Sequence, residues 1–171
     1  LDGALTSVVD LSVSGTSNLG ANVTTSGTQT YTGAAIISAN ISLTGGSQLT
    51  FSSTVDSSDT DGTTDSRTLT TTFTETEFDR AVGGTYALGA LDINGNLDLD
   101  AAITSAASID VSGTSNLGAN VTTSGTQTYT GAVTLSTDVT LTTTDSNVTF
   151  SSTVDGDGTA RDLTIDTNGT T

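Results

Sequence analysis

The chain has 171 residues and a formal net charge of −16, because 19 acidic residues face only three arginines. It contains no Lys, His, Cys, Met, Pro or Trp, while Thr and Ser together make up more than a third of it. These absences exclude disulfides, Cys/His metal sites, a Ser-His-Asp triad and a P-loop lysine. The negative charge argues against nucleic acid and anionic lipid as partners.

No apolar run approaches the ~18 residues of a membrane-spanning helix, so we expect no membrane insertion. The chain starts at Leu1 in the middle of a pattern, without an initiator Met or a signal peptide. We therefore expect it to be a piece of a longer protein. The lack of cysteine is compatible with an extracellular repeat protein, because stacked repeats build a core without disulfides.

A long internal repeat dominates the sequence. Residues 13–34 read VSGTSNLGANVTTSGTQTYTGA, and residues 111–132 are identical. We divide the chain into a first unit, 1–98, and a second, truncated unit, 99–171, of one continuous array.

Shorter segments that alternate apolar and polar residues recur at a spacing of about 20 residues, separated by Gly, Asn, Asp and Ser. The alternation predicts half-buried β-strands and the separators predict turns. Residues 76–84 (TEFDRAVGG) fit either a loop or a single helical turn. The strands expected in chain order lie at 8–13, 21–25, 28–33, 35–43, 47–51, 67–73, 90–93, 108–111, 126–131, 134–142, 147–150 and 162–165.

Two all-β architectures fit these strands. The first is a parallel β-solenoid with turns of about 20 residues, about five in the first unit. The second is a string of β-sandwich modules, one for each long unit. We favour the solenoid because the chain has no Trp, only seven aromatic residues and no Pro-rich linker, and because a sandwich gives the shorter period no role.

Two acidic turns suggest a calcium site. Carboxylates at alternate positions around glycine supply the hard oxygen ligands that Ca²⁺ takes, although neither turn matches an EF-hand loop. The competing interpretation is that Asp simply favours turns. The candidate ligands are Asp56, Asp59, Asp61 and Asp65 in VDSSDTDGTTD, and Asp155 and Asp157 in VDGDG.

A third acidic segment, DINGNLDLD at 92–100, alternates Asp and Asn in the same way. Arg67 and Arg161 occupy equivalent repeat positions, where ion pairs with Asp65 or Asp162 would be structural. Carboxylate pairs could serve a polysaccharide-acting enzyme. Such pairs arise easily in a chain so rich in Asp, however, so we expect no enzyme and no resident cofactor other than Ca²⁺.

The segments GTQTYTGAVTLSTDVTLTTTDSNVTFSSTVDGDG (125–158) and FDRAVGGTYALGALDINGN (78–96) resemble the β-strand repeats of very large bacterial surface proteins. These proteins are similar to filamentous-haemagglutinin-type adhesins and autotransporter passengers. The resemblance implies a secreted β-solenoid at the cell surface that works in adhesion, biofilm or envelope structure, with no catalytic residues.

Together these observations predict a non-enzymatic structural or adhesive segment of an extracellular bacterial surface protein or fibre. Its partners would be neighbouring repeats or further copies of itself, and surface glycans. The alternative is a module that binds glycan, ice or another surface along one face, ice being suggested by the Thr arrays. A stalk predicts near-identical faces in both units. A binding module predicts a face that differs between the units, and the first unit carries extra residues at 57–66 where such a difference would lie.

Overall fold

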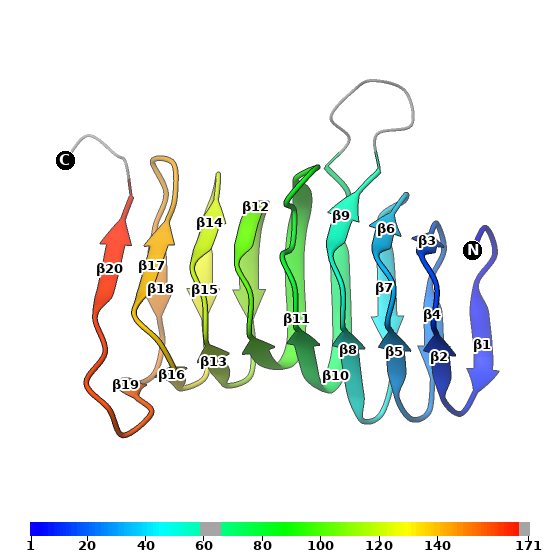
Figure 1. Cartoon of the computed structure of the whole chain (residues 1–171), viewed down its shortest axis with the longest axis horizontal. Coiled ribbons are helices and arrows are strands. Elements are labelled where there is room, and N and C mark those ends of the chain that lie inside the picture. The colour runs from blue at the N-terminus through cyan, green and yellow to red at the C-terminus, as the bar shows by residue number, and fades with distance from the viewer. Residues whose placement is uncertain (59–65, 168–171) are drawn as a thin grey trace.

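The computed structural model describes residues 1–58 and 66–167. Within these ranges the chain has no helix, and its strands wind into turns that stack along one axis, with the first and last strands at opposite ends of the stack (Figure 1). The expected all-β parallel β-solenoid, with the short turn length that the sequence indicates, is thereby confirmed. The sandwich alternative is wrong, because each strand pairing in the described ranges is parallel.

The solenoid has three faces, each a column of parallel strand segments. Face A contains β1 (Leu5–Val8), β4 (Val23–Thr25), β7 (Ile41–Thr44), the first parts of β10 (Leu69–Phe78) and β11 (Leu88–Leu99), the last part of β12 (Ile103–Val111), β15 (Gln127–Tyr129) and β18 (Val148–Phe150). Face B contains β2 (Leu11–Val13), β5 (Gln29–Tyr31), β8 (Gln48–Phe51), the last parts of β10 and β11, β13 (Ser115–Leu117), β16 (Val133–Leu135) and β19 (Val154–Gly156). Face C contains β3 (Ser17–Leu19), β6 (Ala35–Ile37), β9 (Val55–Ser57), a bridge at Val82, the first part of β12, β14 (Val121–Thr123), β17 (Val139–Thr142) and β20 (Leu163–Asp166).

The length of a turn varies while the register of the strands is kept. Leu5 pairs with Val23, and Val23 pairs with Leu43, so the second of these turns is slightly longer than the first. A much longer turn separates Ile41 from its partner Leu69, and this turn contains the insertion noted in the first unit. The longer turn still pairs in register, residue for residue, from Ile41 with Leu69 to Thr44 with Thr72.

Side chains alternate between the core and the surface along each short strand. In β3, Ser17 and Leu19 are buried and Asn18 is exposed, and in β13 Ser115 and Leu117 are likewise buried. Because successive side chains of a strand point to opposite sides, a short strand of this kind sends its first and last side chains inward and its middle one outward. The inward positions form the apolar core, and the outward Thr, Asn and Asp form the surface.

An aromatic stack runs through the core beneath face B. Tyr31, Phe51 and Phe78 come from successive turns, with ring centroids 5.2 and 5.4 Å apart. The Gln29 side-chain amide, also fully buried, donates to the carbonyl of Thr44 at 3.0 Å, and its oxygen accepts from the Tyr31 hydroxyl at 3.1 Å. The polar groups of this layer are thus paired inside the core.

Asparagines at the corners connect one turn to the next. The side-chain oxygen of Asn22 accepts from the backbone N–H of Ser42 at 2.9 Å, and that of Asn120 accepts from Thr140 at 2.8 Å. Ser42 and Thr140 lie in β7 and β17, one residue before the pairing with β4 and β14 begins, so their N–H groups need such partners. This requirement explains why Asn recurs between the strands at matching positions of the repeat.

The identical segments of the two units lie on different faces. Strand β5, with Gln29 and Tyr31, belongs to face B, whereas its identical copy β15, with Gln127 and Tyr129, belongs to face A. The same displacement by one face relates β3 to β13 and β7 to β17. Counted in strand segments, the long repeat covers five full turns minus one face. The second unit is therefore rotated about the solenoid axis by one third of a turn relative to the first.

Two local expectations are corrected by the structure. Residues 76–78 of TEFDRAVGG complete strand β10, and the rest contains a bridge at Val82, so no helical turn forms there. Residues 92–99 of DINGNLDLD are part of strand β11 rather than an acidic loop. Residues 76–78 and 92–99 pair with neighbouring turns, whereas residues 79–81, 83 and 84 lie outside the strands, as the loop alternative expected.

We expect Phe51→Ala to lower the free energy of unfolding by about 3–5 kcal/mol, because it removes a fully buried ring that stacks on both sides. Phe150→Ala is the matched control, because Phe150 is only half-buried and stacks on Tyr129 alone. Urea unfolding monitored by circular dichroism measures both. Equal losses would contradict a core stacked turn upon turn.

Candidate functional site

The predicted calcium ligands do not gather into one site in the described part of the chain. Asp59, Asp61 and Asp65 lie outside the described residues. Asp56 lies in β9 on face C, where its Oδ1 atom accepts from the N–H groups of Thr85 and Tyr86 at 2.7 and 3.2 Å. Asp56 thus holds a neighbouring segment of backbone in place.

The second predicted turn is closed by an ion pair. Arg161 donates from Nη2 to Asp157 Oδ2 at 2.7 Å and from Nε to Oδ1 at 3.1 Å. The hydrogen bond from Arg161 lowers the pKa of the Asp157 carboxyl. Asp162, suggested above as the partner of Arg161, instead donates its backbone N–H to Asp138.

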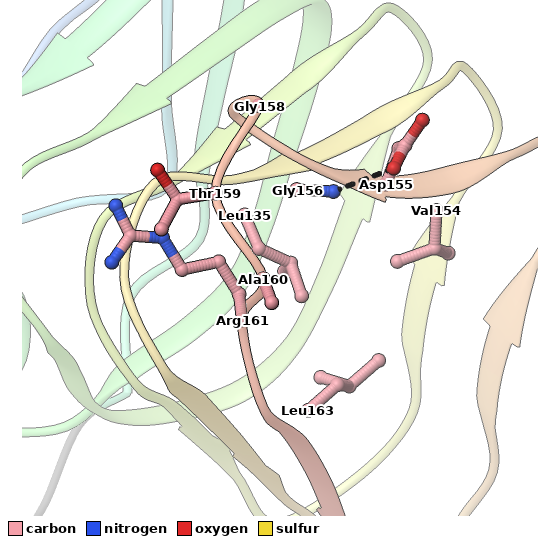
Figure 2. Close-up of a pocket in the computed structure, with 9 residues that line it drawn as sticks. All are labelled: Leu135, Val154, Asp155, Gly156, Gly158, Thr159, Ala160, Arg161 and Leu163. Carbon is pink, nitrogen blue, oxygen red and sulfur yellow. Dashed lines mark hydrogen bonds between the residues drawn. The ribbon is translucent and has the colours of Figure 1, made fainter.

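A hollow of about 670 Å³ lies at the end of the solenoid formed by β19 and β20, and the last of the predicted ligands, Asp155, lines it. Figure 2 shows the Asp155 carboxylate and the Arg161 guanidinium on opposite sides of the hollow. Asp155 accepts from the N–H of Gly156 at 2.9 Å. The apolar side chains of Leu135, Val154 and Leu163 also line the hollow, so it continues the core rather than gathering charged groups.

The carboxylates that do gather lie on face B and at the corner that follows it. One oxygen each of Glu77, Asp79 and Asp100 lies within 4.8 Å of the others, a spacing at which they could share a metal ion. Glu77 pairs in register with Asp98 of the next turn. With Glu75, these five residues form a group that we call the acidic ladder.

Hydrogen bonds from the preceding turn fix part of the acidic ladder. Gln48 donates from Nε2 to Glu75 at 3.2 Å and to Glu77 at 2.9 Å, and the Thr50 hydroxyl donates to Glu77 at 3.0 Å. On the other side, the Asn116 side-chain amide donates to Asp98 at 2.9 Å. The acidic ladder is therefore bordered by neutral donors on two adjoining turns.

The close carboxylates perturb one another. Burial raises the pKa of Glu77, with a further rise from the charges of Asp79, Asp98 and Asp100, against a hydrogen bond from Thr50. Burial and the charges of Asp98 and Asp79 likewise raise the pKa of Asp100. Raised carboxyl pKa values accompany both cation sites and general acids, so chemistry at the ladder depends on what binds there.

Asp98 and Asp100 belong to a segment that the sequence marks as acidic, whereas Glu77 and Asp79 lie in TEFDRAVGG, which it marks only as a loop or a helical turn, and Glu75 lies in neither. The ladder forms because TETEFD and GNLDLD occupy equivalent positions of consecutive turns. The signal in the sequence is that acidic residues recur at equivalent positions of consecutive turns, and it is visible only when the turns are aligned with one another.

A continuous threonine array, on which ice binding would depend, is absent from the middle of face A. Outward-facing residues in register there are Thr70, Asp92, Asp110, Thr128 and Thr149. Two carboxylates interrupt the row of hydroxyl and methyl groups. Other threonines do stack on face A, where Thr24, Thr44 and Thr72 lie in register, and Thr suits solvent-facing strand positions in general.

Comparison with protein-family models, curated proteins and solved structures found no match to this chain. Among residues 1–58 and 66–167, the structure has no helix of the length and apolarity that crossing a membrane requires.

The raised pKa values of Glu77 and Asp100 mean that the folded chain takes up protons at a higher pH than the unfolded chain. We therefore expect stability to increase as the pH falls from 7 toward about 5, since unfolded carboxyls titrate near 4. Thermal melts across this range measure the effect. Glu77→Gln should reduce the increase, while Asp138→Asn, an equal change of charge away from the ladder, should not.

Divalent cations should relieve the same repulsion. We expect Ca²⁺ to raise the melting temperature, and EDTA to reverse the rise, by an amount set by the ratio of free ion to dissociation constant. Asp100→Asn should remove more of this rise than Asp155→Asn, because only Asp100 lies in the acidic ladder. A larger effect of Asp155→Asn would place the cation at the turn proposed from sequence.

Proposed function

We propose that this chain is a non-catalytic structural segment of a secreted bacterial surface protein or extracellular fibre. The observation that carries the proposal is the continuous parallel pairing of strands on three faces, through successive turns, around a single apolar core. Strand pairing on three faces holds each turn to the turns on both sides, so the stack resists bending about any direction. A stiff, extendable rod suits a stalk or a filament.

The surface chemistry supports an extracellular role of this kind. A net charge of −16 keeps neighbouring rods apart and in solution. The absence of cysteine means that the rod would not depend on the redox state of its surroundings. The resemblance of residues 125–158 and 78–96 to bacterial surface repeats points in the same direction.

The rotation between units suits a spacer more than a repeated adhesive patch. Identical residues of the two units, such as Thr24 and Thr122, lie on face A and face C respectively. A feature repeated in every unit would face a new direction each time. We expected a stalk to have near-identical faces in both units. Instead, the identical segments of the two units lie on different faces around the axis.

As the partner we propose a further copy of the same chain, which would pair with this one through the edge strands. In β2, the Leu11 N–H donates to Thr28 of the next turn, so the alternate N–H of Ser12 points away from that turn. An unpaired edge of this kind can pair with further strands of the same chain type. More of the same chain or a second copy would satisfy it equally well.

We expect sedimentation velocity to show concentration-dependent, end-to-end association that strengthens with salt, because salt screens repulsion between acidic chains. Ser12→Pro should abolish it by removing the outward N–H without breaking the bonds to β5. Ser12→Ala, which keeps the N–H, is the matched control. Association that Ser12→Pro leaves intact would show that this edge is not the contact, and a monomer at all concentrations would contradict self-association.

A further inference from the structure

A cavity of about 350 Å³ opens on face C of the first unit. The outward residues of three successive strands, Asn18, Ile36 and Asp56, lie in register and line it. Thr85 and Tyr86, from the segment between the Val82 bridge and β11, line it as well. Its volume is at the small end of the roughly 300–1,000 Å³ range of small-molecule sites. We call it the Tyr86 groove.

The segment that carries Tyr86 is held in place without any ligand. Asp56 accepts hydrogen bonds from the Thr85 and Tyr86 N–H groups, and the Tyr86 carbonyl accepts from the Ser57 N–H at 3.2 Å. Gly83, with φ of +67°, lets the chain pass close to Ser105, where a Cβ atom would come within 1.9 Å of the carbonyl oxygen. A ligand would meet a pre-organised site, which reduces the entropic cost of binding.

Several polar groups of the Tyr86 groove have unused hydrogen-bonding capacity. Ser58 lines the cavity and is only 6% exposed, yet its hydroxyl has no hydrogen-bond partner among residues 1–58 and 66–167. Within the described residues, the Oδ2 atom of Asp56 accepts no hydrogen bond and the Nδ2 atom of Asn18 donates none. A buried hydroxyl without a partner costs folding free energy, so a ligand that pairs with it gains that energy back.

The apolar lining of the groove is unusual for this surface. Tyr86 is 41% exposed and Ile36 is 39% exposed, whereas Tyr31 and Tyr129 are fully buried. An aromatic ring beside a carboxylate, an amide and a hydroxyl offers one apolar face and several hydrogen-bonding groups at close range. A sugar ring has the complementary chemistry, with C–H groups on its faces and hydroxyls at its edge.

The charge of the site selects among sugars. None of the described residues that line the groove is basic, Asp56 Oδ2 accepts no hydrogen bond from the described part of the chain, and the chain is strongly acidic. Uronic and sialic acids would be repelled. We propose that the Tyr86 groove binds a neutral mono- or disaccharide. This role goes beyond that of a structural rod and does not depend on it.

The second unit provides an internal control. Asn116, Thr134 and Asp155 lie in the same register on face B as Asn18, Ile36 and Asp56 do on face C. At these positions Thr134 replaces the exposed Ile36, and in the sequence Asp157 stands where the first unit has Ser58. Substitutions here alter similar exposed side chains without touching the proposed site.

The test is an NMR titration of the full chain with galactose, mannose, N-acetylglucosamine and lactose, with sialic acid as the anionic comparison. We expect at least one neutral sugar to bind with a millimolar dissociation constant and to shift the amide resonances of Ser57, Ser58 and Tyr86. Tyr86→Ala should weaken binding about tenfold. Asp56→Asn, which keeps the acceptor that holds Thr85 and Tyr86, should weaken it about fivefold.

Ser58→Ala separates binding from folding. It removes a hydroxyl that has no partner in the described part of the free protein, so we expect weaker sugar binding with no fall in melting temperature. Thr134→Ala and Asp155→Asn should leave binding unchanged. The proposal is overturned if no neutral sugar shifts these resonances, if sialic acid binds more tightly, or if the control variants weaken binding as much as Tyr86→Ala does. None of these results bears on end-to-end association, which involves a different strand.

Discussion

Parallel hydrogen bonding between successive turns is the constraint on which the rest of this structure depends. A single turn has too few apolar side chains to offset the conformational entropy lost on ordering it. Pairing in register places each inward side chain on the equivalent one of the next turn, as in the stack of Tyr31, Phe51 and Phe78. The core is thus shared among turns, and none of them has to be stable by itself.

The same register also makes the surface. Because outward residues of consecutive turns stack as regularly as inward ones, side chains that are one full turn apart in sequence become neighbours. Glu77 and Asp98 meet in this way in the acidic ladder, and Asn18, Ile36 and Asp56 meet in the Tyr86 groove. The inward positions need only be apolar, small or, like Gln29, paired within the core, which leaves the outward positions free to vary.

The sequence predicts the fold well because strand alternation, turn residues and turn length are local signals. It does not reveal the number of faces, and therefore could not predict that β5 and its identical copy β15 lie on different ones. The three faces are built alike and turns differ in length, so the face on which a segment lies depends on how many strand segments precede it. The site was harder to predict: Asp56 was singled out as a metal ligand but holds the Tyr86 backbone, and Tyr86 itself carries no motif.

Paired cysteine substitution tests the three-faced parallel stack most directly, since the chain has no cysteine of its own. Thr128 and Thr149 face outward in register on adjacent strands, about 4.8 Å apart, within the range that a disulfide spans. Thr134 is closer to Thr128 in sequence but lies on another face. The stacked solenoid predicts rapid oxidation of the Thr128→Cys, Thr149→Cys pair and none of the Thr128→Cys, Thr134→Cys pair. The opposite result would contradict it.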